Sequence, residues 1–372
     1  MRWSDERRRD LRSQWLRWSQ GLWATSLVML LGCSSVEDAG VPVSSVDGDG
    51  FEEPADPWGG DAENDSMGSG DSDGDPADDG GFPLDVGSGE APQPPEPGMF
   101  DGCPGALPNA WIFCEDFELL SDPADVALDY QELDGAFTLV DNVGASGHHA
   151  MEVHYREGEE AAGRMVLSFG ASPIDHGGRP SFASEESFPE IYWRVRVMTA
   201  PGWPDVGPGQ LTRTLSFADE TWSEAVVAHL RSVGGDVVME AVPVTCVSDD
   251  EVACAGFDDQ GSLEPLGPLP GQAPIYAEPE SGQWHCIEGH LALNDPGLAN
   301  GVLEFWIDEQ WQAGSSDLDL RGRWTDYAIN ALVIDNHWPG GAPAPLYRWI
   351  DDIVISSEPI GCDIKLDDAA PG

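Results

Sequence analysis

Between about residue 102 and residue 363, apolar and polar residues alternate in short runs with a period of two. The clearest pair is CIEGHLAL at residues 286–293 and VLEFWID at residues 302–308, which flank the turn-rich segment NDPGLANG. Strict alternation over about four to eight residues is typical of a strand with one buried face, whereas a helix repeats about every 3.6 residues. The pattern therefore predicts a β-hairpin.

The same alternation recurs in nine further runs separated by clusters of Gly, Pro, Asn and Asp. These runs are IFCEDFEL, AMEVHY, RMVLSF, YWRVRVM, RTLSFAD, AVVAHLRS, VVMEAV, INALVI and YRWIDDIVIS. No long amphipathic helix and no internal repeat is evident. About a dozen strands in one unit pack as two antiparallel sheets or a barrel. We expect one all-β domain at residues 101–363, a two-sheet antiparallel jelly-roll sandwich, followed by a tail at residues 364–372.

The alternation also divides each strand into a core face and a polar face. The positions predicted to face the core are Ile287, Leu291, Leu293, Leu303, Phe305 and Ile307 in the hairpin, and Trp193, Val195, Val197, Val226, Ala228 and Leu230 elsewhere. The positions on the opposite face are Trp284, Cys286, Glu288, His290, Glu304, Trp306, Asp308, Tyr192, Arg194, Arg196, His229 and Arg231. These polar and aromatic side chains are the first candidates for a site.

The first 32 residues are predicted to be an export signal. Six arginines precede the apolar run at residues 22–31, which is too short to span a bilayer. The run ends in Leu31-Gly32-Cys33, which resembles the lipobox of bacterial lipoproteins. That resemblance implies acylation of Cys33 and a location at the bacterial outer membrane or cell surface. An ordinary signal peptide with a chance cysteine is the alternative.

Residues 33–100 are dominated by Asp, Glu, Gly, Pro and Ser, and no Lys or Arg occurs between Arg17 and Arg156. Such a composition cannot offset the entropy of folding, so an extended acidic tether is expected. The formal net charge of −51 argues against nucleic acid and anionic lipid as direct partners. Contact with a membrane is expected through the lipid anchor only. The DGDG and DSDGD pieces lack the register of an EF-hand loop, so no cofactor is predicted and structural calcium stays open.

Six cysteines other than Cys33 occur in the predicted domain, and an even number in an exported chain indicates three disulfides. Cys246 and Cys254 enclose the short loop CVSDDEVAC and are predicted to pair with each other. The pairing of the other four stays open: Cys103, Cys114, Cys286 and Cys362. No CxxC pair and no suitably spaced histidine accompanies them, so no metal site is predicted.

The hairpin W-x-C-I-E-x-H-x-x-L-N-x-P-G-x-x-N-G-x-x-x-F-W-I-D and the ending INALVIDNHWPGGAPAPLYRWIDDIVIS resemble the concanavalin A-like jelly rolls, especially polysaccharide-lyase-like domains. The resemblance covers roughly residues 193–357 and implies that the last strand lies beside the first. The chain departs from the pattern at Glu309, where a turn glycine is usual. It also lacks the Glu of an R-x-E-x-R strand, a Q-x-H pair and the lysine of a Tyr-x-Lys segment.

The resemblance implies an elimination reaction on a uronate-containing glycan. Such a reaction needs a cation on the carboxylate, a base for the C5 proton and an acid for the leaving oxygen. Arg194 or Arg196 would bind the carboxylate, His290 or His229 would be the base, and Tyr192 would be the acid. A glycoside hydrolase with Glu288 and Glu304 as its carboxylates ranks lower, because the E-x-D-x-x-E signature is missing.

A non-catalytic carbohydrate-binding module is the alternative from a different class. Sugars stack on Trp and Tyr, and their hydroxyls bond to polar side chains. The residues predicted to bind glycan are His229, Arg231, Glu288, Glu304, Trp306, His337 and Trp338. Both the elimination hypothesis and the binding-module hypothesis describe a monomeric surface protein that recognises an extracellular polysaccharide. In the elimination hypothesis this polysaccharide is acidic. A surface protein without a small ligand is the third possibility.

Overall fold

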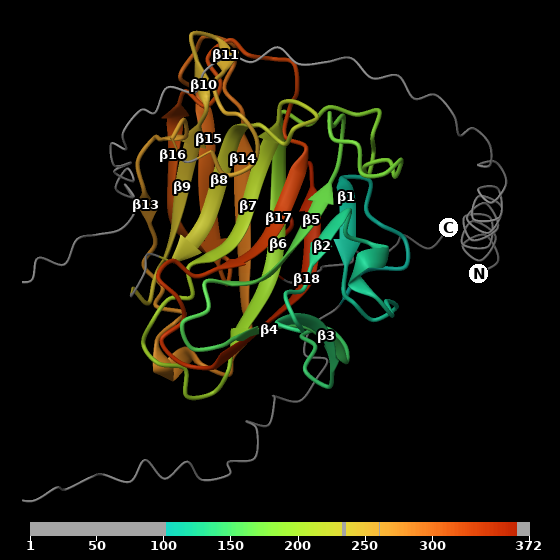
Figure 1. Ribbon diagram of the computed structural model, residues 1–372, viewed down its shortest axis with the longest axis vertical. Coiled ribbons are helices and arrows are strands. Elements are labelled where there is room, and N and C mark those ends of the chain that lie inside the picture. Colours follow the sequence, from blue (N-terminus) through green and yellow to red (C-terminus); the bar gives the residue numbers. More distant parts are fainter. Residues whose placement is uncertain (1–101, 233–235, 260, 363–372) are drawn as a thin grey trace, which may run out of the picture. The chain divides into compact units, whose positions relative to one another are not determined.

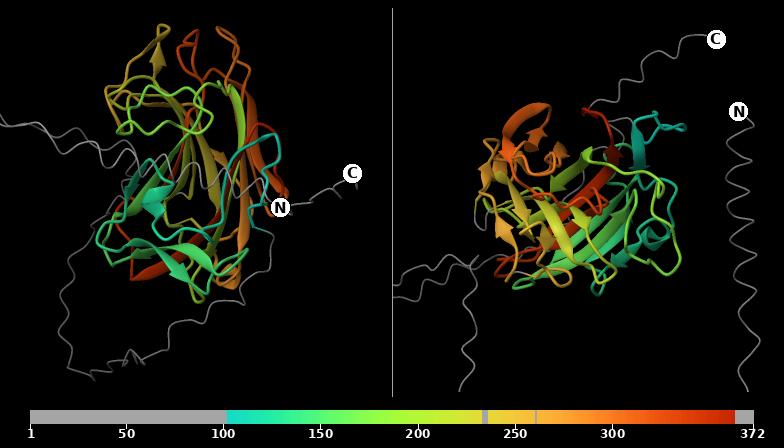
Figure 2. Two further views of the ribbon diagram at one scale, coloured as in Figure 1. Left: turned by 90° about the vertical axis from the view of Figure 1, so that its right-hand side faces the viewer. Right: turned by 90° about the horizontal axis from the view of Figure 1, so that it is seen from above.

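The computed structural model describes residues 102–232, 236–259 and 261–362, so the predicted signal, the tether, Cys33 and the predicted tail at residues 364–372 lie outside it. Within these ranges two eight-stranded antiparallel sheets pack face to face (Figures 1 and 2). This arrangement confirms the predicted all-β, two-sheet antiparallel sandwich. None of the helical segments in the described ranges has the length and hydropathy needed to cross a bilayer.

The first sheet, here called the β6 sheet, has β6 (Glu190–Thr199) and β18 (Leu346–Ser356) at its centre. On one side of this pair lie β14 (His285–Ala292), β15 (Gly301–Ile307) and β16 (Gln310–Leu318). On the other side, β4 (His149–Tyr155) and β1 (Trp111–Glu115) both pair with β18, and β3 (Phe137–Asp141) pairs with β4. The pairing of β1 with β18 confirms that the last strand lies beside the first.

The second sheet, here called the β7 sheet, has β7 (Gln210–Phe217) at its centre. The strands on one side are β8 (Glu224–Ser232), β9 (Met239–Thr245), β12 (Glu264–Pro265) and β13 (Leu269–Pro270). The strands on the other side are β17 (Ala331–His337), β5 (Ala161–Ser168) and β2 (Asp129–Gln131). A small hairpin of β10 (Val247–Ser248) and β11 (Glu251–Val252) and two short 3-10 helices, η1 (Pro123–Asp125) and η2 (Glu278–Glu280), complete the described elements.

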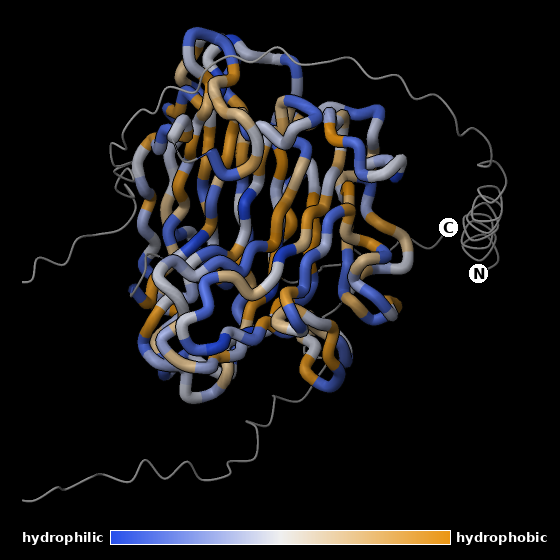
Figure 3. Tube along the Cα trace, in the orientation of Figure 1, coloured by the Kyte–Doolittle hydropathy of each residue, from blue (hydrophilic) through white to orange (hydrophobic). Residues whose placement is uncertain are grey.

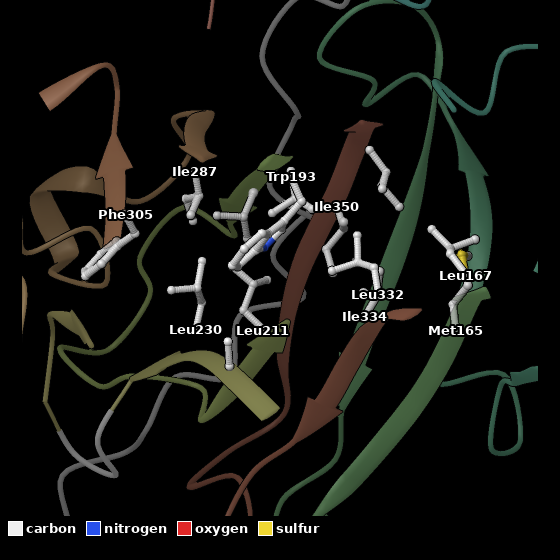
Figure 4. Packing of buried hydrophobic residues seen from close by; sticks show 14 of the residues in the cluster. Met165, Leu167, Trp193, Leu211, Leu230, Ile287, Phe305, Leu332, Ile334 and Ile350 are labelled. Atoms are coloured by element: carbon white, nitrogen blue, oxygen red, sulfur yellow. The ribbon is translucent and has the colours of Figure 1, made fainter. Parts of the chain in front are cut away.

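The core lies between the two sheets, where the inward positions of the alternating strands meet. Figure 3 shows apolar and polar positions alternating along the strands. Figure 4 shows the facing residues, which are Trp193, Ile287, Phe305 and Ile350 from the β6 sheet and Leu211, Leu230, Leu332, Ile334, Met165 and Leu167 from the β7 sheet. All twelve positions predicted to face the core are buried there, from Trp193 to Ile307. The alternation therefore assigned the inner face correctly.

Trp193 links the two sheets. Its indole Nε1 donates a hydrogen bond of 3.1 Å to Oγ1 of Thr212 on the facing sheet. The indole fits because its strand partner is Gly289: a Cβ added there would lie 2.2 Å from Cζ2 of Trp193. Packing of the Trp193 indole in the core therefore requires a glycine at this position of the hairpin.

Three disulfides are formed within the described residues. Cys246 pairs with Cys254, as predicted. The remaining four cysteines pair as Cys103–Cys114 and Cys286–Cys362. The last bond ties β14 to the end of the described chain, 76 residues further on.

Candidate functional site

The polar side chains of the opening hairpin and of β6 share the outer face of the β6 sheet. Glu288 lies opposite Arg194 on β6 and opposite Trp306 on β15, and His290 lies opposite Tyr192 and Glu304. The structure thus brings together seven of the predicted residues: Tyr192, Arg194, Arg196, Glu288, His290, Glu304 and Trp306.

A C-terminal segment, residues 358–362, covers part of this face and is here called the C-terminal strap. The two carboxylate oxygens of Glu288 accept hydrogen bonds of 2.9 Å from the backbone N–H groups of Ile360 and Gly361. Arg194 donates to the carbonyl of Gly361 at 3.1 Å, and Arg196 donates to the carbonyl of Cys362. Together with the Cys286–Cys362 bond, these contacts fix the strap on the sheet.

The two arginines of β6 are buried beneath the strap. Arg194 is 0% exposed and Arg196 is 1% exposed. Arg196 Nε also lies 2.9 Å from a carboxylate oxygen of Asp352, and the guanidinium of Arg194 lies 5.9 Å from the ring centre of Trp111. Burial lowers the pKa of Arg194 to about 10, so it is still charged at neutral pH. The expected contact of these guanidinium groups with a sugar carboxylate does not fit this burial.

His290 is held on both ring nitrogens. Nδ1 lies 3.0 Å from Glu304 and Nε2 lies 2.9 Å from Glu190, and the ring stacks on Tyr192 with centroids 4.1 Å apart. Both ring nitrogens thus face carboxylates of the protein and not a ligand, so the arrangement does not favour His290 as a base.

Trp338 was predicted to stack on sugar, and the structure corrects this. It follows β17, is 3% exposed, and packs its ring against Tyr155 and Trp203 in the core. A side chain enclosed by the two sheets cannot present a face to a polysaccharide. Its neighbour His337 is exposed at the end of the same strand.

The outer face of the β7 sheet carries the other predicted pair, His229 and Arg231. One part of this face is apolar and is covered by partly buried side chains that include Trp222, Phe257 and Leu263. The other part is polar and is here called the His229 face. Its residues are Gln210, Arg213, His229, Arg231, Glu240 and Asp335.

His229 is partly exposed and is oriented by a neighbouring strand. Its Nδ1 lies 3.1 Å from Oε1 of Gln210. With the amide oxygen as acceptor, the proton sits on Nδ1 and the lone pair on Nε2. Burial, together with the charges of Arg213 and Arg231, holds the pKa of His229 well below its usual range. The imidazole is therefore neutral at physiological pH, and its Nε2 can accept a hydrogen bond or a proton.

Arg213 is the centre of an ionic cluster beside His229. Its guanidinium lies 2.8 Å from Asp335 and 3.6 Å from Glu224, and it donates a hydrogen bond to Asp258 from the covering loop. The ring centre of Phe257 lies 4.3 Å from Cζ of the same guanidinium. Although burial opposes the charged form, the three carboxylates raise the pKa of Arg213 above its usual range.

The second arginine of the His229 face, Arg231, is 22% exposed at its side chain and lies 2.9 Å from an oxygen of Glu240. Because the two residues are partners across β8 and β9, their side chains meet on one face of the sheet. Gln210, Glu240, Asp335 and Arg213 were not among the predicted site residues. Extending the alternation of the RTLSFAD and VVMEAV runs would have placed Arg213 and Glu240 on this face.

The arrangement of the His229 face is rich in hydrogen-bonding groups. A neutral imidazole, an amide, two ion pairs and the ring of Phe257 lie together on this face. His229, Arg231 and Phe257 are partly exposed, whereas Arg213, Glu240 and Asp335 are buried. Such groups can bind the hydroxyls and the apolar face of a sugar. Within the residues that the structure describes, no group of three or more His, Cys, Asp or Glu side chains is arranged to hold a metal ion.

Comparison with known proteins gives remote similarities only. No protein-family model and no curated protein matches the chain. Among solved structures, an endo-β-1,4-glucuronan lyase from the fungus Trichoderma reesei is similar at 10% identity and a TM-score of 0.45, over 67% of this chain and 96% of that one. An alginate lyase from Aplysia kurodai is similar at 12% identity and a TM-score of 0.42, over 66% and 98% of the two chains. Similarity this remote transfers no residue roles.

Proposed function

We propose that the chain is an exported protein that binds an extracellular polysaccharide, and that the His229 face is its binding surface. The observation that carries the proposal is the neutral, partly exposed imidazole of His229, fixed by Gln210 between two arginines. Groups held in this way are preorganised, so little side-chain entropy is lost when a ligand binds. The outer face of the β6 sheet is the less suitable surface, since the strap occupies its arginines and Glu288.

The hydroxyls of a sugar match the chemistry of this face. A hydroxyl can donate to Nε2 of His229 and accept from the amide of Gln210. Another can donate to Glu240, whose carboxylate already accepts from Arg231. Phe257 adds a partly exposed ring at the border, on which the apolar face of a sugar can stack.

Elimination on a uronate is the second candidate function. It is favoured by one observation: a neutral histidine whose Nδ1 bonds to an amide oxygen keeps its lone pair on Nε2 and can act as a general base. His229 is then the base that removes the C5 proton, in place of His290. The reaction additionally needs a cation for the sugar carboxylate. Arg213 and Arg231 are both paired with protein carboxylates, so binding without elimination is the favoured function.

Export and anchoring rest on the first 33 residues of the sequence. The arginine-rich start, the short apolar run and Leu31-Gly32-Cys33 support acylation of Cys33 at a bacterial surface. Labelling cells with radioactive palmitate tests this. Label on the wild type and none on Cys33→Ala is expected, and equal labelling of both proteins, or of neither, would rule the anchor out.

A glycan panel tests the binding function. Wild type, His229→Ala and His290→Ala are titrated with immobilised polysaccharides, and each mixture is followed for the absorbance of unsaturated uronate products. Loss of binding only in His229→Ala supports the proposal, and product formation that also requires His229 supports elimination. Loss only in His290→Ala would move the binding surface to the β6 sheet, and absence of any binding by the wild type would refute the proposed function.

A further inference from the structure

We infer that the His229 face selects uncharged polysaccharides and discriminates against polyuronates. The inference rests on the proposed function, namely that this face binds a polysaccharide. It follows from the ion pairs of the arginines, because the arginines are the cationic side chains of this face.

Every guanidinium on the outer face of the β7 sheet has a carboxylate partner. Arg231 pairs with Glu240 at 2.9 Å, and Arg213 pairs with Asp335 at 2.8 Å. At the other edge of the sheet Arg164 pairs with Asp129 at 2.9 Å. A sugar carboxylate that bound an arginine here would have to displace a protein carboxylate that is already in place. The exchange gains little, because one charge-assisted bond replaces another.

The excess of acidic residues over arginines on this face also disfavours an anionic ligand. The outer face and the loop that touches it contain three arginines: Arg164, Arg213 and Arg231. The five acidic residues in contact with them are Asp129, Glu224, Glu240, Asp258 and Asp335. The acidic residues outnumber the arginines by two. Protonation of Glu224 makes this excess smaller, because burial raises the pKa of Glu224 to about 7. His229 adds no positive charge at neutral pH.

An uncharged polymer meets none of these obstacles. Its hydroxyls donate to Nε2 of His229 and to the carboxylates of Glu240 and Asp335, and no ion pair has to break. Asp335 is 11% exposed at its side chain and Glu240 is 6% exposed, so each presents only an edge to a ligand. That geometry suits hydrogen bonding from a hydroxyl.

Titrations with two classes of polymer test the inference: an uncharged β-glucan and mannan, and a polyglucuronate. The wild type is expected to bind an uncharged polymer at least tenfold more tightly than the polyglucuronate. Glu240→Gln keeps the shape of the side chain and removes the ionic partner of Arg231. It is expected to shift the ratio of the two affinities about tenfold in favour of polyglucuronate over the uncharged polymer.

Two further variants keep the test interpretable. Asp258→Asn, on the covering loop, removes one of the carboxylates around Arg213 and is expected to shift the preference in the same direction. Asp141→Asn, on edge strand β3 of the other sheet, is the matched charge control and is expected to change nothing. Tighter binding of polyglucuronate than of any uncharged polymer would overturn the inference and leave the proposed function standing. An unchanged preference in both Glu240→Gln and Asp258→Asn would also overturn it. Absence of binding to all the polymers would refute the proposed function itself.

Discussion

His229 on β8 and Gln210 on β7 are joined side chain to side chain, with Nδ1 of the imidazole 3.1 Å from Oε1 of the amide. They are diagonal neighbours, since His229 lies opposite Arg213 and Gln210 lies opposite Arg231. The bond fixes the ring and its tautomer, so Gln210 positions His229, and its amide N–H groups are left for a ligand.

Gln210→Glu is predicted to raise the pKa of His229. A carboxylate at Nδ1 favours the imidazolium, which the wild-type amide does not. The measurement is an NMR pH titration of the His229 ring protons in both proteins. Gln210→Leu serves as the control of similar size that adds no charge. A His229 titration midpoint that is the same in wild type and Gln210→Glu would show that the two side chains do not interact in solution.

Glu288→Ala is predicted to release the strap while the sheet stays folded. The change leaves the N–H groups of Ile360 and Gly361 without their acceptor, at a cost to the free energy of unfolding of about 3 kcal/mol. Hydrogen exchange at these two amides is expected to accelerate at least tenfold. Glu304→Ala, which alters the same face without contacting the strap, is expected to leave their exchange unchanged. If both variants exchange as the wild type does, Glu288 does not hold the strap.

The two disulfides that close loops of very different length should contribute unequally to stability. In the chain-entropy description, the 76-residue separation of Cys286 and Cys362 corresponds to about 4.5 kcal/mol, and the 8-residue separation of Cys246 and Cys254 to about 2.5 kcal/mol. Replacing each pair by serine and measuring the free energy of unfolding in denaturant checks this order. A larger loss from the shorter loop would contradict it.

Glu224 should make the protein less stable as the pH rises. Burial raises its pKa from an ordinary value near 4.5 to about 7, so the folded state keeps a proton that the unfolded chain releases. The corresponding stabilisation, about 3 kcal/mol, is present below pH 4.5 and is lost as the pH rises through 7. Glu224→Gln is predicted to flatten this part of the profile in denaturant unfolding between pH 4.5 and 7.5. Parallel profiles for the two proteins would show that Glu224 is not the group responsible.

The fold was largely predictable because the strands of a sandwich keep a strict period of two. Each of the eleven predicted runs overlaps a strand, and their inner residues, such as Trp193 and Phe305, lie in the core. The strands β16 (Gln310–Leu318) and β3 (Phe137–Asp141) were not predicted. Both lie at an edge of the β6 sheet, where few of their side chains are buried and no strict alternation results. The short strands β2, β10, β11, β12 and β13 are two or three residues long and show no period.

The candidate site was less predictable, since alternation shows which residues share a face and not what covers it. Glu288 and Arg194 do share a face, but the strap that covers them lies some 70 residues further along the chain than Glu288. Its docking depends on the Cys286–Cys362 pairing, which local sequence does not reveal. The prediction for Trp338 was wrong for a related reason. This residue lies just beyond β17, and its side chain is buried in the core.

The most direct test of the account is an NMR titration of the wild type with an uncharged oligosaccharide, observed at the histidine rings. The His229 face lies on one sheet and His290 on the other, so the two rings report on opposite outer faces. Saturable shifts are expected at His229, and none at His290 or Tyr192. Saturable shifts at His290 with an unperturbed His229 would contradict it.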